Sequence, residues 1–127
     1  MRGIWLERTP LAVLVRPVAA GSGNFLLTMK GSFHTVQRSY ALPFIFTGTV
    51  MYFVVSFQGS MEALRSVQEL WHFTDYTVGH AHLAMYGFVA FLLWGAIYGL
   101  FPRLSGHEPS QIAVGAHFWC SLVGVLI

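Results

Sequence analysis

The chain has 127 residues, of which 55% are hydrophobic, 16% aromatic and only 9% charged. Soluble domains carry about 25% charged residues, so this composition excludes a water-facing globular surface and indicates lipid as the main solvent. The formal net charge of +2 comes from scattered basic residues that form no basic stripe, which argues against nucleic acid as a partner.

The N-terminal part, residues 1–38, shows no strong element. Its apolar stretch Leu11–Val15 stops at Arg16 and Pro17, which is too short for a signal peptide or for a spanning helix of about 20 residues. The segment holds five basic residues against one acidic residue: Arg2, Arg8, Arg16, Lys30 and Arg38 against Glu7. Because basic segments stay on the cytoplasmic side, we expect residues 1–38 to be irregular and cytoplasmic.

The first long apolar run is Ala41–Phe57. Ser39 precedes it as a candidate N-cap, and Pro43 falls in the first turn, where a missing N–H costs little. We therefore predict a transmembrane helix over 39–58. The next residues, 59–75, have more acidic than basic side chains and alternate with apolar ones, which predicts an amphipathic connector on the periplasmic side.

A second apolar run predicts a transmembrane helix over 76–102, ended by Pro102, and a cytoplasmic loop over 103–111 follows. The last run, 112–127, has too few residues to cross a bilayer of about 30 Å at 1.5 Å per residue. We expect it to be a truncated transmembrane helix, which makes the chain a fragment. The single cysteine, Cys120, lies in this run and is expected to be a buried apolar side chain without a disulfide. The predicted fold is an all-α integral membrane bundle of about three transmembrane helices.

Two histidines near the start of the second span carry the chemistry. Ionisable side chains inside a membrane span are costly and mark function. Residues at i and i+2 lie roughly 200° apart on a helix, so His80 and His82 face opposite ways and cannot easily share one metal ion. Each can hold a different cofactor, and neutral imidazole is an axial ligand of haem iron. The alternative is that both are packing residues, hydrogen-bonded to neighbouring helices.

The neighbours of the two histidines differ in size. A flat macrocycle lying against a helix needs small side chains beside its ligand. The expected neighbours are small on the His80 side and larger on the His82 side: Ala84 and Gly87 against Met85 and Tyr86. We therefore expect two unlike pockets.

The region from about Ser39 to Gly124 also carries a longer pattern. It contains LPFIFTGTVMYFVVSFQGSMEALRSVQELWHFTDYTVGHAHLAMYGF, then FPRL, then AHFW. This pattern resembles the catalytic subunit of cbb-type haem–copper oxidases, most specifically in YTVGHAH. The AHLAMYGF portion looks equally like the related nitric oxide reductases. The resemblance includes none of residues 1–30.

The resemblance implies roles for several residues. It makes His80 the proximal ligand of a high-spin haem beside copper, and His82 one axial ligand of a low-spin haem, both haems being b-type. The copper ligands and the second low-spin ligand would come from the remaining helices of the subunit. Electrons would come from c-type cytochrome subunits, and O₂ would be reduced to water with proton uptake, in a bacterial inner membrane. The fragment alone would be inactive.

Weaker expectations concern other polar residues. His72 and Asp75 lie at the predicted outer interface, where haem propionates can be hydrogen-bonded, and the resemblance puts Tyr52 in the span where the family has a proton route. The alternatives, which the residues themselves favour, are a solvated interfacial loop for His72 and Asp75 and simple packing for Tyr52. Many cbb-type members have Glu where this chain has Gln58, and an amide cannot relay a proton. His117 is expected to be hydrogen-bonded between helices and to bind no metal.

Three other functions are compatible with the same residues. A nitric oxide reductase subunit would use the same two histidines with iron in place of copper. A non-catalytic membrane haem protein for electron transfer is the second possibility. The third is a transporter with a histidine site near the membrane midplane.

Overall fold

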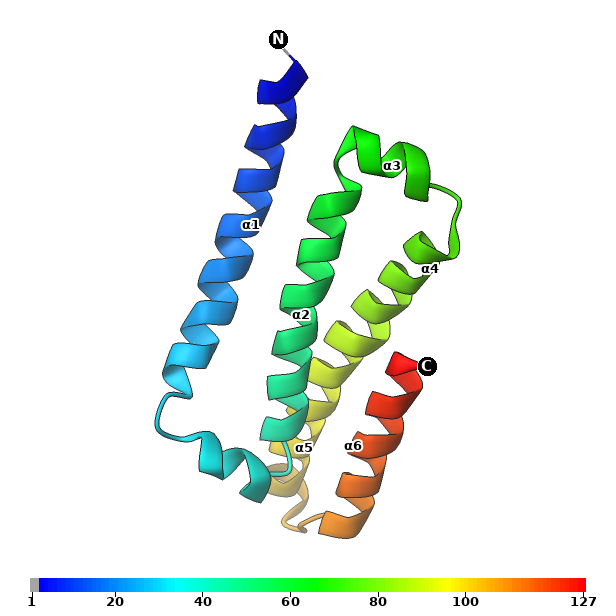
Figure 1. Ribbon diagram of the computed structural model, residues 1–127. Coiled ribbons are helices and arrows are strands. Elements are labelled where there is room, and N and C mark those ends of the chain that lie inside the picture. Colours follow the sequence, from blue (N-terminus) through cyan, green and yellow to red (C-terminus); the bar gives the residue numbers. More distant parts are fainter. Residues whose placement is uncertain (1–2) are drawn as a thin grey trace.

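The computed structural model describes residues 3–127, with side chains described at 13 and from 15 onward. Every regular element in this part of the chain is a helix (Figure 1). The elements are α1 (Gly3–Thr28), η1 (Phe33–Arg38), α2 (Leu42–Glu62), α3 (Arg65–Trp71), α4 (Asp75–His82), η2 (Leu83–Ala90), α5 (Phe91–Ser105) and α6 (Gln111–Leu126). The described residues therefore agree with the predicted all-α class.

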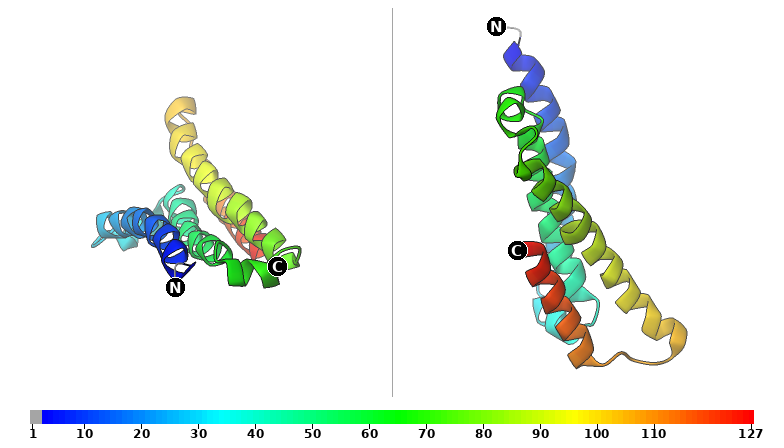
Figure 2. Two further views of the ribbon diagram at one scale, coloured as in Figure 1. Left: turned by 90° about the horizontal axis from the view of Figure 1, so that it is seen from above. Right: turned by 90° about the vertical axis from the view of Figure 1, so that its right-hand side faces the viewer.

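The N-terminal part differs from the prediction. In place of an irregular 1–38 segment, the structure has the 26-residue helix α1 and the 3₁₀ helix η1. α1 lies alongside α2 for most of its length (Figures 1 and 2) and passes through Pro17. A proline inside a helix removes one backbone hydrogen bond, and packing along a neighbouring helix offsets that cost. The prediction was wrong here because it relied on local helix-breaking residues and took no account of packing against α2.

α2 begins and ends close to the predicted 39–58. The Ser39 hydroxyl oxygen accepts hydrogen bonds from the backbone N–H groups of Ala41 and Leu42, each at 3.3 Å, and Pro43 lies in the first turn. The helix then continues to Glu62, into the predicted connector. The rest of the connector holds the short helix α3.

The second predicted span is one continuous helix, Asp75–Ser105, built from α4, η2 and α5. It passes Pro102 and ends at Ser105, and the next residue, Gly106, has a φ of +69°, the left-handed turn that commonly closes a helix. Its middle, η2, is π-helical, which means that each turn of the backbone there contains more residues than a turn of an α-helix. Of the described helices, this one and α2 are long and apolar enough to cross a membrane, whereas α6 is shorter.

The packed core is small and lies where α2, α5 and α6 meet. Phe44 and Phe91 are fully buried, and Val114 packs with them. Glycines let the helices approach: a Cβ at Gly95 would lie 2.5 Å from Ile45 Cγ1. Many other large apolar side chains are exposed, and so is Cys120, against its predicted burial. Helices with exposed apolar faces suit contact with lipid or with further helices.

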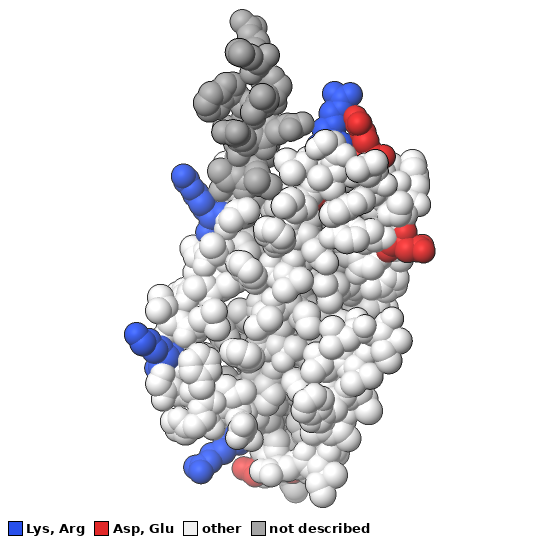
Figure 3. Space-filling view, in the orientation of Figure 1, with Lys and Arg blue, Asp and Glu red and all other residues white. Residues whose placement is uncertain are grey.

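Charged side chains lie mainly at the two ends and along one edge (Figure 3). Since α1 runs along α2, residues 3–38 do not lie together at one end of the molecule. Their cytoplasmic placement stays a prediction. Lys30, Arg38 and Arg103 lie at the end where α2 and α6 begin. The acidic residues Glu62, Glu69 and Asp75 lie at the opposite end, together with Arg65.

Candidate functional site

The two histidines lie on α4, which starts directly after a tight turn. Thr74 is extended and precedes the helix, and its hydroxyl donates to the Trp71 carbonyl at 2.6 Å. Asp75 occupies the first turn, where its negative charge is favoured by the helix dipole. The helix therefore begins five residues before His80 and seven before His82.

The ring of His82 has a fixed orientation. Its Nδ1 lies 2.9 Å from the carbonyl oxygen of Val78, one turn earlier in the same helix. A carbonyl oxygen only accepts, so Nδ1 carries the proton and Nε2 keeps a free lone pair. Tyr86 lies one turn further on, its ring stacked on the imidazole at 5.8 Å with 13° between the planes. A histidine that binds a metal commonly donates its second ring N–H to a carbonyl in this way.

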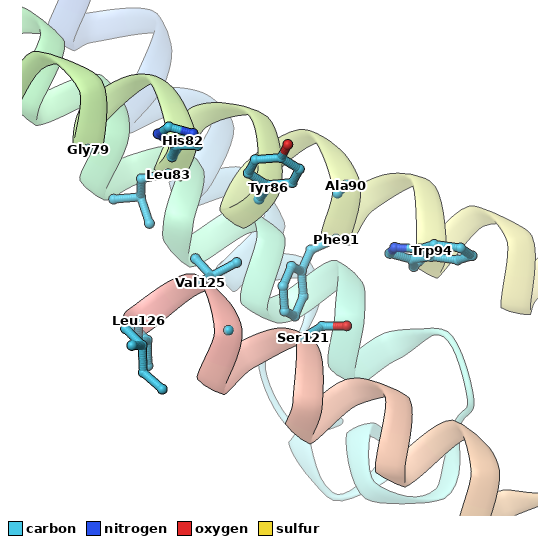
Figure 4. Close-up of a pocket in the computed structure, with 12 residues that line it drawn as sticks. Gly79, His82, Leu83, Tyr86, Ala90, Phe91, Trp94, Ser121, Val125 and Leu126 are labelled. Atoms are coloured by element: carbon cyan, nitrogen blue, oxygen red, sulfur yellow. The ribbon is translucent and has the colours of Figure 1, made fainter.

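His82 borders a hollow of about 640 Å³ between its own helix and α6 (Figure 4). Tyr86, Phe91 and Trp94 form the wall on the histidine's side, and Ser121 and Val125 face them from α6. Cofactor pockets have volumes of about 300–1,000 Å³ and are mostly apolar with a few polar groups. The hollow can therefore take a flat apolar group with one imidazole at its edge. His82 also borders a shallower hollow of about 400 Å³ lined by its own helix alone.

His80 contacts a different part of the molecule. Its Nδ1 lies 3.5 Å from Gln58 Oε1 of α2, a long hydrogen bond, and a Cβ at Gly59 would lie 3.4 Å from its Nε2. The half-buried ring borders a hollow of about 240 Å³ between α1, α2 and α4. The two imidazoles thus border different hollows, as their spacing predicted.

The neighbours of His80 are not arranged as expected. Gly87 was expected to make room for a macrocycle. It is buried instead, and a Cβ there would lie 3.3 Å from Val125 Cγ1 of α6 and 3.5 Å from Met51 Cγ of α2. Side chains of α2 and α6 therefore occupy the space beside Gly87 that was expected to be free. The spacing rule used for the sequence could not take these neighbouring helices into account.

His72 and Asp75 do not join either histidine hollow. His72 Nδ1 lies 2.8 Å from Gln68 Nε2, and its ring lies against Phe73, whose backbone has φ = +66°. It borders a separate hollow that contains Glu62 and Glu69. Asp75 is exposed at the start of α4. Both are at the same end of the molecule as the start of the histidine helix.

Tyr52 is half-buried on α2, and its ring lies 4.7 Å from that of Phe88. The contact is ordinary aromatic packing. Among the side chains that the structure describes, no three His, Cys, Asp or Glu residues come together as a metal-binding group.

One polar pair inside the helices was only half predicted. His117 is hydrogen-bonded between helices, as expected, and the partner is Tyr98, whose hydroxyl lies 2.9 Å from His117 Nδ1. Trp94 packs edge-on against the same imidazole at 4.6 Å. Nothing in the sequence marked Tyr98, because the two residues are joined only by how α5 and α6 turn back on each other.

Comparison with known proteins identifies the family to which this chain is similar. Residues 8–127 match the profile of the family described as cytochrome C and quinol oxidase polypeptide I. The chain belongs to this family. The match begins at residue 8, so the earlier restriction of the resemblance to residues after 30 was wrong. Most of the α1 helix, from residue 8 onward, is part of the shared region.

Several curated relatives support the same assignment. The chain is 32% identical over 117 residues to the cbb3-type cytochrome c oxidase subunit CcoN1 of Stutzerimonas stutzeri, covering 91% of this chain and 25% of the relative. It is 31% identical to a cytochrome c oxidase subunit 1 homolog of Azorhizobium caulinodans, covering 91% and 21%. It is 36% identical over 110 residues to cytochrome c oxidase polypeptide 1 of Halobacterium salinarum, covering 85% and 18%. The chain spans about a quarter or less of the length of these relatives.

Proposed function

We propose that this chain forms part of the membrane-embedded catalytic subunit of a terminal respiratory oxidase in a bacterial inner membrane, crossing it more than once. The observation that carries the proposal is His82: an imidazole of fixed tautomer at the edge of a hollow of about 640 Å³. The family membership and the names of the relatives support an oxidase over a nitric oxide reductase, a separate haem carrier or a transporter.

The residues at His82 fit a low-spin haem. Val78 holds the proton on Nδ1, which directs the lone pair of Nε2 to a metal. Tyr86, Phe91 and Trp94 offer flat apolar surface, and Ser121 offers one hydroxyl. A haem bound here would supply a reversible one-electron carrier. The chain's own contribution is to orient the imidazole and to exclude water from one side of the ring; a second axial ligand would come from another helix of the subunit.

The residues at His80 fit a high-spin haem less well. The Gln58 oxygen would orient the ring, but the hollow of about 240 Å³ is below the usual size of a cofactor pocket. Because Gly59 has no side chain, the space beside Nε2 stays open; a Cβ there would lie 3.4 Å from it. We retain His80 as the proposed proximal ligand on the family resemblance, and derive no reaction step from it.

The remaining parts of the proposal concern the intact subunit. Its haems would be b-type, copper would be held by other helices, and c-type cytochrome subunits would deliver electrons for the reduction of O₂ to water. This chain alone would be inactive. His72 and Asp75 would interact with haem propionates at the end where α4 begins, and Tyr52 would line a proton route along α2.

The test replaces each histidine in the intact subunit and measures haem spectra. Because the two rings border different hollows, each substitution should remove a different signal. His82→Ala should abolish the low-spin, six-coordinate spectrum and leave a carbon-monoxide-binding haem. His80→Ala should abolish the carbon-monoxide-binding signal and leave most of the low-spin band.

His107→Ala is the matched control, since His107 is exposed in the loop before α6 and is hydrogen-bonded to Ser105, away from both hollows. It should change neither spectrum. If both haem spectra survived His80→Ala and His82→Ala, the histidines would be packing residues and the haem proposal would be wrong.

A further inference from the structure

A groove of about 430 Å³ lies away from both histidines, at the end of the molecule where α2 and α6 begin. Its rim is polar and comes from the end of η1 and the residues after it, with Arg38, Ser39 and Tyr40, and from the first residue of α6, Gln111. It is separate from the hollow at His82, which α6 borders with its last two turns.

The groove changes from polar to apolar with depth. Beyond the rim it is lined by Phe46 and Thr47 of α2 and by Gly115, Phe118 and Trp119 of α6. Both helices start at the rim, so residues seven or eight positions into α6 lie about 10 Å deeper, at 1.5 Å per residue. Phe44, fully buried, forms part of the wall, and Trp119 is 64% exposed.

The position and charge of the groove suit one class of ligand. α2 is long and apolar enough to cross a membrane, so its first residues lie at the level of the lipid headgroups. Arg38 puts a cation at the rim, and guanidinium binds phosphate well. Glu108, which accepts a hydrogen bond from the Tyr40 hydroxyl at 3.4 Å, puts one negative charge nearby. A singly charged phosphate diester is therefore favoured over a more highly charged group.

We infer that this groove binds one phospholipid molecule, with its phosphate at Arg38 and an acyl chain along Gly115 and Phe118. The polar rim matches the headgroup and the apolar depth matches the chain. Such a lipid would fill the space between the start of α2 and the start of α6. This goes beyond the proposed oxidase function and does not depend on haem binding.

The test counts the phospholipids that the purified intact subunit retains in native mass spectrometry. The delipidated protein is supplied with dioleoyl-phosphatidylglycerol, dioleoyl-phosphatidylcholine or dioleoylglycerol, which lacks phosphate. The two phospholipids should bind and dioleoylglycerol should not. Arg38→Gln should weaken phospholipid binding roughly tenfold, because one charge-assisted interaction is lost. Arg103→Gln removes a cation at the same end but outside the groove, and should leave binding unchanged.

A second variant tests the apolar part. No atom lies within 4 Å of a Cβ at Gly115, so a side chain can start there, and Gly115→Leu should occupy the groove and abolish retention. Gly21→Leu on α1, equally open, is its control. A phospholipid with a photoreactive acyl chain should label α2 near Thr47 or α6 near Gly115 in the unaltered protein. Equal retention in Arg38→Gln and Arg103→Gln, or no labelling at these positions, would overturn the inference and indicate that another helix covers the groove.

Discussion

Gln58 gives the ring of His80 its orientation. The distance of 3.5 Å between Gln58 Oε1 and His80 Nδ1 is long, yet the amide lies on α2 and the imidazole on α4, so the contact ties one helix to the other. In metal sites, the group that accepts from the second ring nitrogen keeps the ligand in its tautomer. An amide does this without carrying charge.

Gln58→Leu should therefore weaken binding at His80 and spare His82. Loss of such an acceptor typically costs about 10–100-fold in metal affinity. We expect the carbon-monoxide-binding haem content of the intact subunit to fall while the low-spin band persists. Gln111→Leu is a suitable control, because Gln111 is exposed at the start of α6 and borders neither histidine hollow. Equal loss of both haems in Gln58→Leu would indicate a general folding defect and contradict this role.

Among the helices, the contact between α2 and α5 depends on close backbone approach. A Cβ at Gly95 would lie 2.5 Å from Ile45 Cγ1 and 3.3 Å from the Ala41 carbonyl oxygen. A Cβ at Gly99, one turn later, would lie 3.5 Å from Ala41 Cβ, which is ordinary van der Waals contact. The two glycines therefore offer a matched pair.

Gly95→Ala should destabilise the protein by about 1–3 kcal/mol, since overpacking forces the helices apart. Gly99→Ala should be neutral or slightly stabilising, because alanine favours a helix by about 1 kcal/mol over glycine. The free energy of unfolding in detergent, measured by denaturant titration, compares them. Equal stability of the two variants would show that α2 and α5 do not pack as described.

The helices themselves could largely be predicted, and their contacts could not. Apolar runs marked α2, the Asp75–Ser105 helix and α6 within a few residues of their ends. Local signals such as Pro43 and Ser39 correctly predicted the start of α2, because their effect on the helix is confined to one turn. α1 was missed because its stability comes from α2, and the Gln58–His80 contact because it joins residues 22 positions apart. The placement of His80 and His82 on opposite sides of their helix could be predicted from the sequence, because it depends only on helical spacing.

For the whole molecule, the distribution of charge predicts an orientation in the membrane. Among the residues whose side chains the structure describes, Lys30, Arg38 and Arg103 lie at one end and Arg65 at the other, and an excess of basic residues favours the cytoplasmic side. We expect the α5–α6 loop to be cytoplasmic and α3 to be periplasmic. This would place the start of the histidine helix toward the periplasm.

Labelling of single cysteines in intact cells tests this orientation. In a Cys120→Ser background, Ser66→Cys on α3 should react with a membrane-impermeant reagent, and Ser105→Cys should react only after the cells are opened; both positions are exposed. Reaction of Ser105→Cys alone in intact cells would show that the orientation is reversed.

The π-helical segment Leu83–Ala90 also bears on how this helix can change over evolutionary time. In a regular α-helix held at both ends, one inserted residue rotates everything beyond it by about 100° and breaks the packing there. A π-helical stretch absorbs one residue locally, so its loss would restore a plain α-helix without turning His82 relative to Phe91. Natural variants of this helix that differ in length by one residue should therefore differ within Leu83–Ala90, the stretch where a change in length leaves both flanking regions in phase.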